Sequence, residues 1–307
     1  MNRRKFIGLS AAAASLTATR GAGQDSAEKP LLSFGLITDV QYADVDPNGE
    51  RHYRESIPKL KTAVEFLAKK SLSFTLHLGD FIDRDFKAFD AVLPLLGVLG
   101  HPIHHLLGNH DYTVTDGEKG LVVAKLGMPD DYYTLRKSGV RFVMIDTNDV
   151  SIYKYPKGSP ENLGADALLK KLTAENFAAA KQWNGGVSPA QLTWLDGELT
   201  AATAAKERVI LCGHHPLLPA DANQAWNSGD LLAMIDKHPC VAAYFCGHNH
   251  AGAEEIRNGI PFITFKSMLH EPGITAYSVI HLHKDKLEIE GYGREQPRAI
   301  PLRPLAI

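Results

Sequence analysis

The chain has 307 residues, of which 44% are hydrophobic and 22% are charged, a composition that is ordinary for a soluble globular protein with one large domain or two small ones. Its formal net charge at pH 7 is −2 and it has no long run of Lys and Arg, which argues against a nucleic acid or an anionic membrane as its partner. No stretch beyond the N-terminus is long and apolar enough to span a bilayer, so stable membrane insertion is not expected.

Residues 1–23 have the pattern of a targeting segment and are left out of the fold prediction. Arg3 and Arg4 precede a short, weakly apolar stretch, an order that resembles a bacterial twin-arginine export signal. Cleavage is expected near Ala22 or Gly23. Because the segment carries four Lys and Arg and no acid, its loss would change the net charge to −6. We therefore expect the twin-arginine export machinery as a partner and a periplasmic or secreted location. The alternatives are a disordered basic tail and a retained anchor.

Hydrophobic periodicity predicts strands that alternate with helices, followed by a β-rich C-terminal part. Apolar residues recur at helical spacing from Ile57 to Leu67, within a helix expected at residues 51–70. Pro94 weakens a second candidate helix at residues 86–99. This order of elements suits a layered α/β sandwich with mixed sheets. The predicted strands are residues 31–38, 73–78, 103–107, 132–135, 140–145, 209–212, 241–246, 260–265, 275–283 and 286–292.

Residues 151–187 interrupt this alternation. A turn-rich patch at residues 157–160 comes before a candidate helix at residues 165–182. We interpret the segment as an insertion near the mouth of a site, either a substrate-facing lid or a surface excursion without function. Directly after it, the order Ser188-Pro189-Ala190-Gln191 is typical of a capping box with Pro at the first helical position, which predicts a helix through Leu199.

Three cysteines, Cys212, Cys240 and Cys246, do not form the pattern of a disulfide framework. Cys212 and Cys246 lie inside apolar runs, where Cys is usually a small buried hydrophobe. A disulfide between Cys240 and Cys246 in an oxidising compartment stays open as an alternative.

Five of the apolar runs end in residues that bind metal ions. In α/β folds, ligands bind outside the carboxyl ends of the strands. Metal binding is the simplest common cause for five strand ends with such residues. The endings contain Asp39 and Gln41; Asp80 and Asp83; Asn109, His110 and Asp111; His214; and His248 and His250.

The order of these motifs, Asp-x-Gln, Gly-Asp-x-x-Asp, Gly-Asn-His-Asp, His-x-Pro and Gly-His-Asn-His, resembles the calcineurin-like metallophosphoesterase superfamily. Gln41, where that superfamily usually has His, resembles the branch of manganese-dependent ADP-ribose/CDP-alcohol diphosphatases. Arg51-His52-Tyr53-Arg54 and Asn184-Gly185-Gly186-Val187-Ser188 add to this likeness, which runs from about residue 32 to about residue 271. The resemblance implies a four-layer α/β/β/α sandwich with two mixed sheets, as one domain over residues 24–307.

The superfamily pattern also implies two metal sites that share Asp80. One consists of Asp39, Gln41, Asp80 and His250, and the other of Asp80, Asn109, His214 and His248. Two divalent ions about 3.5–4 Å apart would clamp a phosphoryl group and deprotonate a shared water that attacks phosphorus. His110 is expected to stabilise charge or donate a proton, oriented by Asp111, while Asp83 supports a ligand.

Gln41 predicts which metal is bound. An amide oxygen is a harder and weaker ligand than imidazole, so we expect Mn²⁺ at a labile first site, with Mg²⁺, Fe and Zn²⁺ as alternatives. The opposite hypothesis is that Gln41 does not bind metal and that one ion is absent.

Arg51, Arg54 and Tyr112 are candidate substrate-binding residues. Guanidinium groups suit phosphate oxygens, and an aromatic ring near the motifs suits a base. Exposed arginines without a ligand and a packed tyrosine are the alternatives. His77, His104 and His105 lie in apolar runs and are expected to be core or sheet residues.

We expect a hydrolase that cleaves the phosphoanhydride bond of nucleoside diphosphate-linked small molecules such as ADP-ribose and CDP-alcohols. A phosphomonoesterase or a phosphodiesterase, including one for cyclic nucleotides, is the alternative, because fold and metals do not distinguish these reactions. A non-catalytic interaction module is a third alternative, against which the filled ligand positions and His110 argue.

Overall fold

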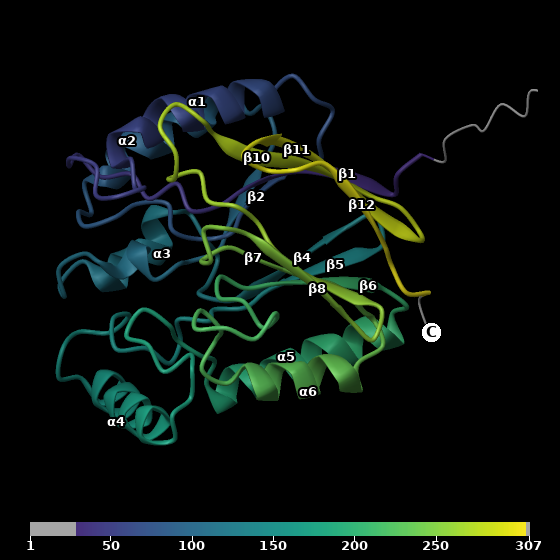
Figure 1. Ribbon diagram of the computed structural model, residues 1–307. Helices are drawn as coiled ribbons and strands as arrows, with labels where there is room; N and C mark the ends of the chain where they lie inside the picture. The colour runs from purple at the N-terminus through teal and green to yellow at the C-terminus, as the bar shows by residue number, and fades with distance from the viewer. Residues whose placement is uncertain (1–28, 305–307) are drawn as a thin grey trace, which may run out of the picture.

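Two six-stranded sheets face each other, and helices cover the outer face of each sheet (Figure 1). The computed structural model describes residues 29–304, so the predicted export signal at residues 1–23 lies outside the described residues. Both sheets contain parallel and antiparallel pairs. The expected four-layer α/β/β/α sandwich with two mixed sheets is therefore confirmed. Within residues 29–304, no helix has the length and apolar character needed to cross a membrane.

The first sheet contains the N-terminal strand in its middle. β1 is parallel to β2 and antiparallel to β10, and it brings the start of the chain against the C-terminal hairpin. Helices α1 (Ser56–Leu67) and α2 (Ala88–Val92) cover this sheet. In spatial order, its strands are β12 (Arg298–Pro301), β11 (Lys286–Gly293), β10 (Ala276–Leu282), β1 (Leu32–Ile37), β2 (Thr75–His77) and β3 (Ile103–His105).

The second sheet is covered by α5 (Pro189–Ala204) and α6 (Ser228–Lys237). Its central strands β5, β6, β7 and β9 are parallel, which places their carboxyl ends at one edge. In spatial order, its strands are β4 (Tyr133–Lys137), β5 (Val140–Met144), β6 (Arg208–Cys212), β7 (Val241–Cys246), β9 (Ile260–Thr264) and β8 (Ala253–Arg257).

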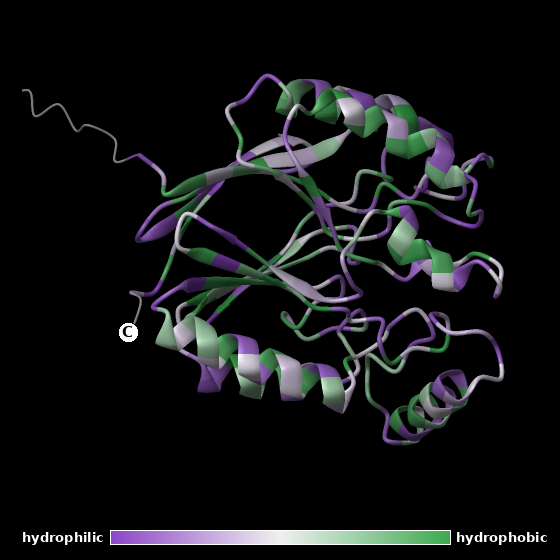
Figure 2. Ribbon diagram, turned by 180° about the vertical axis from the view of Figure 1, so that it is seen from behind, coloured by the Kyte–Doolittle hydropathy of each residue, from purple (hydrophilic) through white to green (hydrophobic). Residues whose placement is uncertain are grey.

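An aromatic core joins the two sheets. Phe34 of the first sheet stacks on Phe74 at 5.2 Å between ring centroids and meets Phe142 of the second sheet edge-on at 5.3 Å. Such pairs contribute about 0.5–1.5 kcal/mol beyond the burial of their area. Buried hydrophobic side chains from both sheets form one cluster, and the helices mix hydrophobic with hydrophilic residues (Figure 2). This core fixes how the strand ends of the two sheets meet.

Three of the predicted helices differ from the observed ones. The helix expected at residues 51–70 is shorter, because α1 begins at Ser56 and ends at Leu67. The expected helix at residues 86–99 ends as α2 and continues as a 3-10 helix (Leu93–Val98), because Pro94 lacks the N–H that an α-helix needs there. Helix α4 (Pro160–Ala174), expected at residues 165–182, begins five residues earlier than predicted and also ends before residue 182. Ser159 caps it by accepting a hydrogen bond from the Asn162 N–H at 3.2 Å. Four other short elements precede α4 in the chain: α3 (Val122–Lys125) and three-residue 3-10 helices at Tyr53–Glu55, His110–Tyr112 and Lys119–Leu121.

Of the two hydrogen bonds expected in the capping box before α5, the structure confirms one. Ser188 accepts a hydrogen bond from the Gln191 N–H at 3.2 Å, but the Gln191 side chain does not return to Ser188. Its amide instead contacts the backbone of Asp146 and donates to the carboxylate of Asp149. Gln191 thus fastens α5 to the segment that follows β5. The three cysteines are buried as free thiols, so Cys240 and Cys246 do not pair.

His77 and His105 lie in the core, as expected. Their Nδ1 atoms are 3.2 Å apart and both rings contact Phe81. Burial, followed by repulsion from the His104 ring, lowers the pKa of His105 to about 3. The unfolded chain therefore binds a proton at this residue between about pH 6.5 and pH 3, while the folded chain does not.

We expect the free energy of unfolding to fall as pH falls through that window. The test compares the wild type with His105→Gln, which keeps a polar side chain but does not titrate, in chemical denaturation from pH 7 to pH 4. EDTA in every sample keeps the metal-binding histidines free of metal at every pH. The variant should lose less stability than the wild type as pH falls, and equal slopes would contradict the assignment.

Candidate metal centre

The predicted ligands lie on loops that follow β1, β2, β3, β6 and β7. Asp39, Gln41, Asp80 and His248 all have positive φ, at 50°, 44°, 60° and 67°. This backbone region costs non-glycine residues of order 1–3 kcal/mol each and persists only where the surroundings enforce it. The loops brace one another, with the Asp39 N–H donating to Gly79 O and the Gln41 N–H to Asp80 O. Strain concentrated in this way is typical of a functional site.

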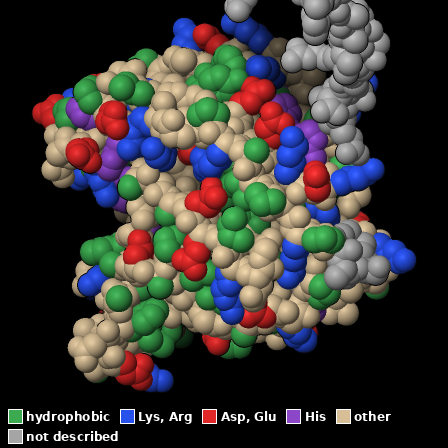
Figure 3. Space-filling model, turned by 45° about the vertical axis from the view of Figure 1, so that its right-hand side comes forward, with side chains coloured by type: hydrophobic (Ala, Val, Ile, Leu, Met, Phe, Trp, Pro, Cys, Tyr) green, Lys and Arg blue, Asp and Glu red, His purple; other side chains and the backbone are tan. Residues whose placement is uncertain are grey.

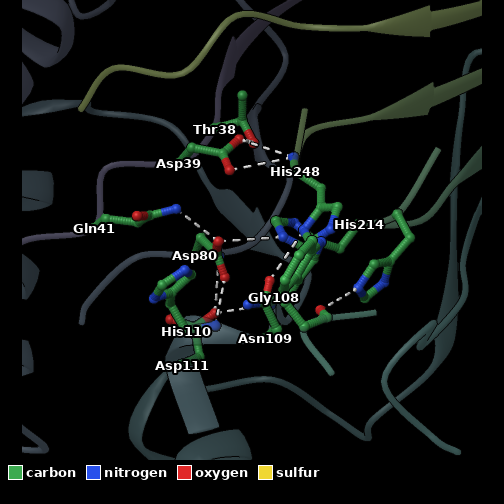
Figure 4. Close-up of polar contacts among 12 residues, drawn as sticks. Thr38, Asp39, Gln41, Asp80, Gly108, Asn109, His110, Asp111, His214 and His248 are labelled. Carbon is green, nitrogen blue, oxygen red and sulfur yellow. Dashed lines mark hydrogen bonds and ion pairs between the residues drawn. The ribbon is translucent and has the colours of Figure 1, made fainter. Parts of the chain in front are cut away.

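Only glycine at position 108 lets the loop that carries Asp80 come this close to the loop after β3. A Cβ at Gly108 would lie 2.0 Å from Asp80 Oδ1, so any side chain would displace that carboxylate. The structure brings all seven predicted ligands together (Figure 4 labels six of them). We call Asp39, Gln41, Asp80 and His250 the first ligand group, and Asp80, Asn109, His214 and His248 the second ligand group.

In the first ligand group, acceptor atoms converge on one point. His250 Nε2 is 3.4 Å from Asp39 Oδ1, and the Gln41 Nε2 donates to Asp80 Oδ2 at 2.8 Å and lies 2.9 Å from His250 Nε2. The Gln41 amide nitrogen thus contacts two of the atoms that would bind a cation in this group. The amide oxygen, Oε1, is buried without a hydrogen-bond partner. The two ends of an amide are assigned from their contacts, so a half-turn places that oxygen among the ligands.

In the second ligand group, too, carboxylate, amide and imidazole atoms lie close together. His214 Nε2 is 3.3 Å from Asp80 Oδ2 and is a buried atom without a hydrogen-bond partner, while His248 Nδ1 is 3.0 Å from Asn109 Oδ1. Burial opposes charge on His214, but the Asp80 carboxylate outweighs burial and raises its pKa to about 9. The carboxylates and imidazoles of each group lie within 4.8 Å of one another and share Asp80. The donor set therefore fits two divalent cations bridged by Asp80.

Gln41→His is expected to shift metal preference from Mn²⁺ towards Zn²⁺, because imidazole favours Zn²⁺ more than an amide oxygen does. His tolerates the positive φ at this position better than most residues. The measurement is competitive binding of Mn²⁺ and Zn²⁺ by the purified proteins. Gln182→His, which adds an imidazole to the same cavity, is the control. An unchanged preference in Gln41→His would count against Gln41 as a ligand.

His110 is held by Asp83 and not, as predicted, by Asp111. Its Nδ1 is 3.1 Å from Asp83 Oδ1, close enough for an ion pair although without the direction of a good hydrogen bond. Burial disfavours the imidazolium, yet the Asp80 and Asp83 carboxylates raise the pKa of His110 above its usual value. Its Nε2 lies 3.5 Å from Arg51 Nη1. Asp83 therefore supports His110, where we had expected it to support a ligand.

Asp111 is an anchor for the backbone. Its Oδ2 accepts from the N–H groups of Gly108 at 2.9 Å and Asp80 at 3.0 Å, and its Oδ1 from those of Phe81 at 2.8 Å and Ile82 at 3.3 Å. Each buried N–H left without a partner costs about 1–3 kcal/mol. Asp111 therefore holds the Asp80 loop in place, and its predicted catalytic role is replaced by a structural one.

A cavity of about 670 Å³ opens over the ligands. Of the three predicted substrate-binding residues, Arg51 lines it. Arg54 pairs instead with Asp44 and Asp46, and Tyr112 is buried in a hydrophobic cluster, so neither of them lines the cavity. The lining residues are Arg51, Asp80, Asn109, His110, Thr113, Tyr153, Gln182, Trp183, Asn223, His248, Asn249, His250 and His270.

Sequence reasoning missed Trp183. Its side chain is 48% exposed and lines the cavity, with Gln182 beside it in the chain. The signal was present, since Trp183 directly precedes the motif that begins at Asn184. The segment at residues 151–187 thus supplies three residues of the cavity wall, Tyr153, Gln182 and Trp183. Its movement as a lid stays a prediction.

The sandwich and its seven ligands define a metal-dependent phosphoesterase. The family model described as calcineurin-like phosphoesterase matches residues 32–252, and the chain belongs to this family. It is 32% identical to a manganese-dependent ADP-ribose/CDP-alcohol diphosphatase of Oryza sativa subsp. japonica, over 90% of this chain and 96% of that one. The human protein of the same name is 30% identical, over 89% and 93%. A crystal structure of a dimetal phosphatase from Danio rerio has a TM-score of 0.80 and 26% identity, over 90% of this chain and 100% of that one.

Proposed function

We propose that the protein is a two-metal hydrolase for the phosphoanhydride bond of nucleoside diphosphate-linked small molecules, with ADP-ribose and CDP-alcohols as the expected substrates. The observation that carries the proposal is the cavity, which places an exposed indole and a guanidinium beside a complete set of metal ligands. The names of the similar proteins support the substrate class.

The residues of the site have different roles in the proposed reaction. Divalent ions, when bound by the two ligand groups, neutralise phosphoryl charge and lower the pKa of a water. Arg51 offers a guanidinium to phosphate oxygens, 3.5 Å from His110 Nε2. His110, held by Asp83, lines the cavity and acts as the proton donor or charge stabiliser. Trp183 supplies a surface on which a base can stack.

The test is hydrolysis by the purified protein with Mn²⁺ of four compounds: ADP-ribose, CDP-choline, a cyclic nucleotide and p-nitrophenyl phosphate. We expect the two diphosphates to have the highest kcat/KM. Preference for the monoester or the cyclic diester would retain the metal site and discard the substrate class.

The variant Trp183→Ala tests whether this side chain binds the base of the substrate. Stacking of a base on an aromatic side chain is worth about 1–3 kcal/mol, so KM for ADP-ribose should rise roughly tenfold. Hydrolysis of p-nitrophenyl phosphate, which has no nucleobase, serves as the internal control and should change little. An equal loss for both compounds would show that Trp183 does not recognise the base.

We further propose that the twin-arginine machinery exports the folded protein to the periplasm or beyond. The support is the order of residues 1–23. On the face shown in Figure 3, acidic and basic side chains are interspersed, as expected for a protein without an anionic polymer as its partner. Replacement of Arg3 and Arg4 by Lys should retain the protein in the cytoplasm, as measured by cell fractionation. Unchanged export would overturn this proposal.

A further inference from the structure

We infer that Asn184 is a positioning residue that fixes the orientation and the tautomer of His248, and thereby connects the segment before α5 to the second ligand group. The inference rests on the two-metal site of the proposed function and adds a residue that the metal-binding motifs do not contain.

The surroundings of Asn184 determine which way its amide points. The residue is fully buried, and its Nδ2 donates to Ala179 O at 2.9 Å and to Ala222 O at 2.8 Å. Carbonyl oxygens only accept hydrogen bonds, so the nitrogen end of the amide must face them. Both hydrogens of the amide are used in this way. Oδ1 is therefore fixed on the opposite side.

That oxygen contacts a metal ligand. Asn184 Oδ1 lies 2.9 Å from His248 Nε2, and because the amide oxygen only accepts, Nε2 must carry the hydrogen. A neutral imidazole has one such hydrogen, so Nδ1 is left with a free lone pair. Nδ1 is the atom that lies 3.0 Å from Asn109 Oδ1 within the second ligand group. Asn184 thus selects the tautomer that can bind a cation there.

His214 shows the same arrangement with a different partner. Its Nδ1 donates to the backbone carbonyl of Leu78 at 2.7 Å, which leaves Nε2 facing Asp80. A backbone carbonyl next to the motif positions His214 without any help from a distant side chain. His248 depends on a side chain that comes from a separate part of the chain. This difference makes Asn184 open to mutational testing.

Asn184 also connects three segments that are far apart in the sequence. Ala179 follows α4, Ala222 lies in the loop after β6, and His248 follows β7. The preceding residue, Trp183, lines the cavity, and its carbonyl lies 3.3 Å from the buried His215 Nε2. Asn184 therefore holds both a segment of the cavity wall and a residue of the second ligand group.

The experiment measures Mn²⁺ binding without reference to activity. Titration of the metal-free protein with Mn²⁺ is followed by electron paramagnetic resonance, which distinguishes a single bound ion from a spin-coupled pair. Asn184→Asp and Asn184→Leu both lose the two hydrogen bonds to the carbonyls, but only Asn184→Asp keeps an acceptor for His248. Asn227→Ala is the matched control, because Asn227 holds the same segment by two hydrogen bonds to the Val187 backbone and contacts no ligand.

We expect Asn184→Leu to weaken the second Mn²⁺ by about 10–100-fold and to lose the coupled signal, with the first Mn²⁺ still bound. Asn184→Asp and Asn227→Ala should keep the coupled signal, even where their melting temperatures in EDTA fall. Should Asn184→Leu not fold, Asn184→Ala takes its place. Equal weakening in Asn184→Leu and Asn184→Asp, or unchanged binding in Asn184→Leu, overturns the inference. A wild type that binds fewer than two Mn²⁺ instead refutes the two-metal site of the proposed function.

Discussion

Asp80→Asn is expected to lower kcat/KM by about 10³-fold or more and to weaken the binding of both Mn²⁺ ions. The carboxylate belongs to both ligand groups, with Oδ2 facing Gln41 and His214. Several kcal/mol of charge stabilisation depend on a bridged pair of ions, and each 1.36 kcal/mol corresponds to a factor of ten in rate. Asn has the same shape and tolerates the φ of 60° at this position, so the loop should keep its conformation.

Asp85→Asn provides the control for this variant. It makes the same chemical change in the same loop, where Asp85 accepts a hydrogen bond from the Lys87 N–H near the start of α2 and contacts no ligand. Its activity and its Mn²⁺ stoichiometry should match those of the wild type. Retention of one tightly bound Mn²⁺ in Asp80→Asn would show that Asp80 serves one site and does not bridge two.

The ligands could be predicted from the sequence because each one directly follows an apolar strand. In both sheets, strand ends gather at one edge, so polar residues after Ile37, His77 and Cys246 must meet. Edge strands were missed for a physical reason. β8 carries Glu254, Glu255 and Arg257 and is exposed along one side, so it lacks a continuous apolar run. Helix α6 had an amphipathic pattern around Leu231 and Ile235 that sequence reasoning overlooked.

The partners of the ligands were harder to predict, because they depend on how loops turn. Asp111 follows His110 directly in the chain, yet its carboxylate points back to the backbone of the Asp80 loop. Asp83, which is 27 positions earlier, supports His110 instead. Asn184 and Trp183 come from a segment that no metal motif marks. Such contacts are set by tertiary packing, on which adjacency in sequence carries no information.

His110→Ala should lower kcat by about 10²–10⁴-fold while both Mn²⁺ ions remain bound, because His110 contributes its backbone N–H, and no side-chain atom, to Asp80. Asp83→Asn should also lower kcat, though by less than His110→Ala, because the Asp83 carboxylate helps to raise the pKa of the imidazole. Substrates that differ only in their leaving group separate the two roles. If His110 donates a proton, the loss grows as the leaving group becomes poorer, whereas charge stabilisation gives the same loss throughout. A full rate in Asp83→Asn would contradict the assignment of Asp83 as the residue that holds His110 ready for the reaction.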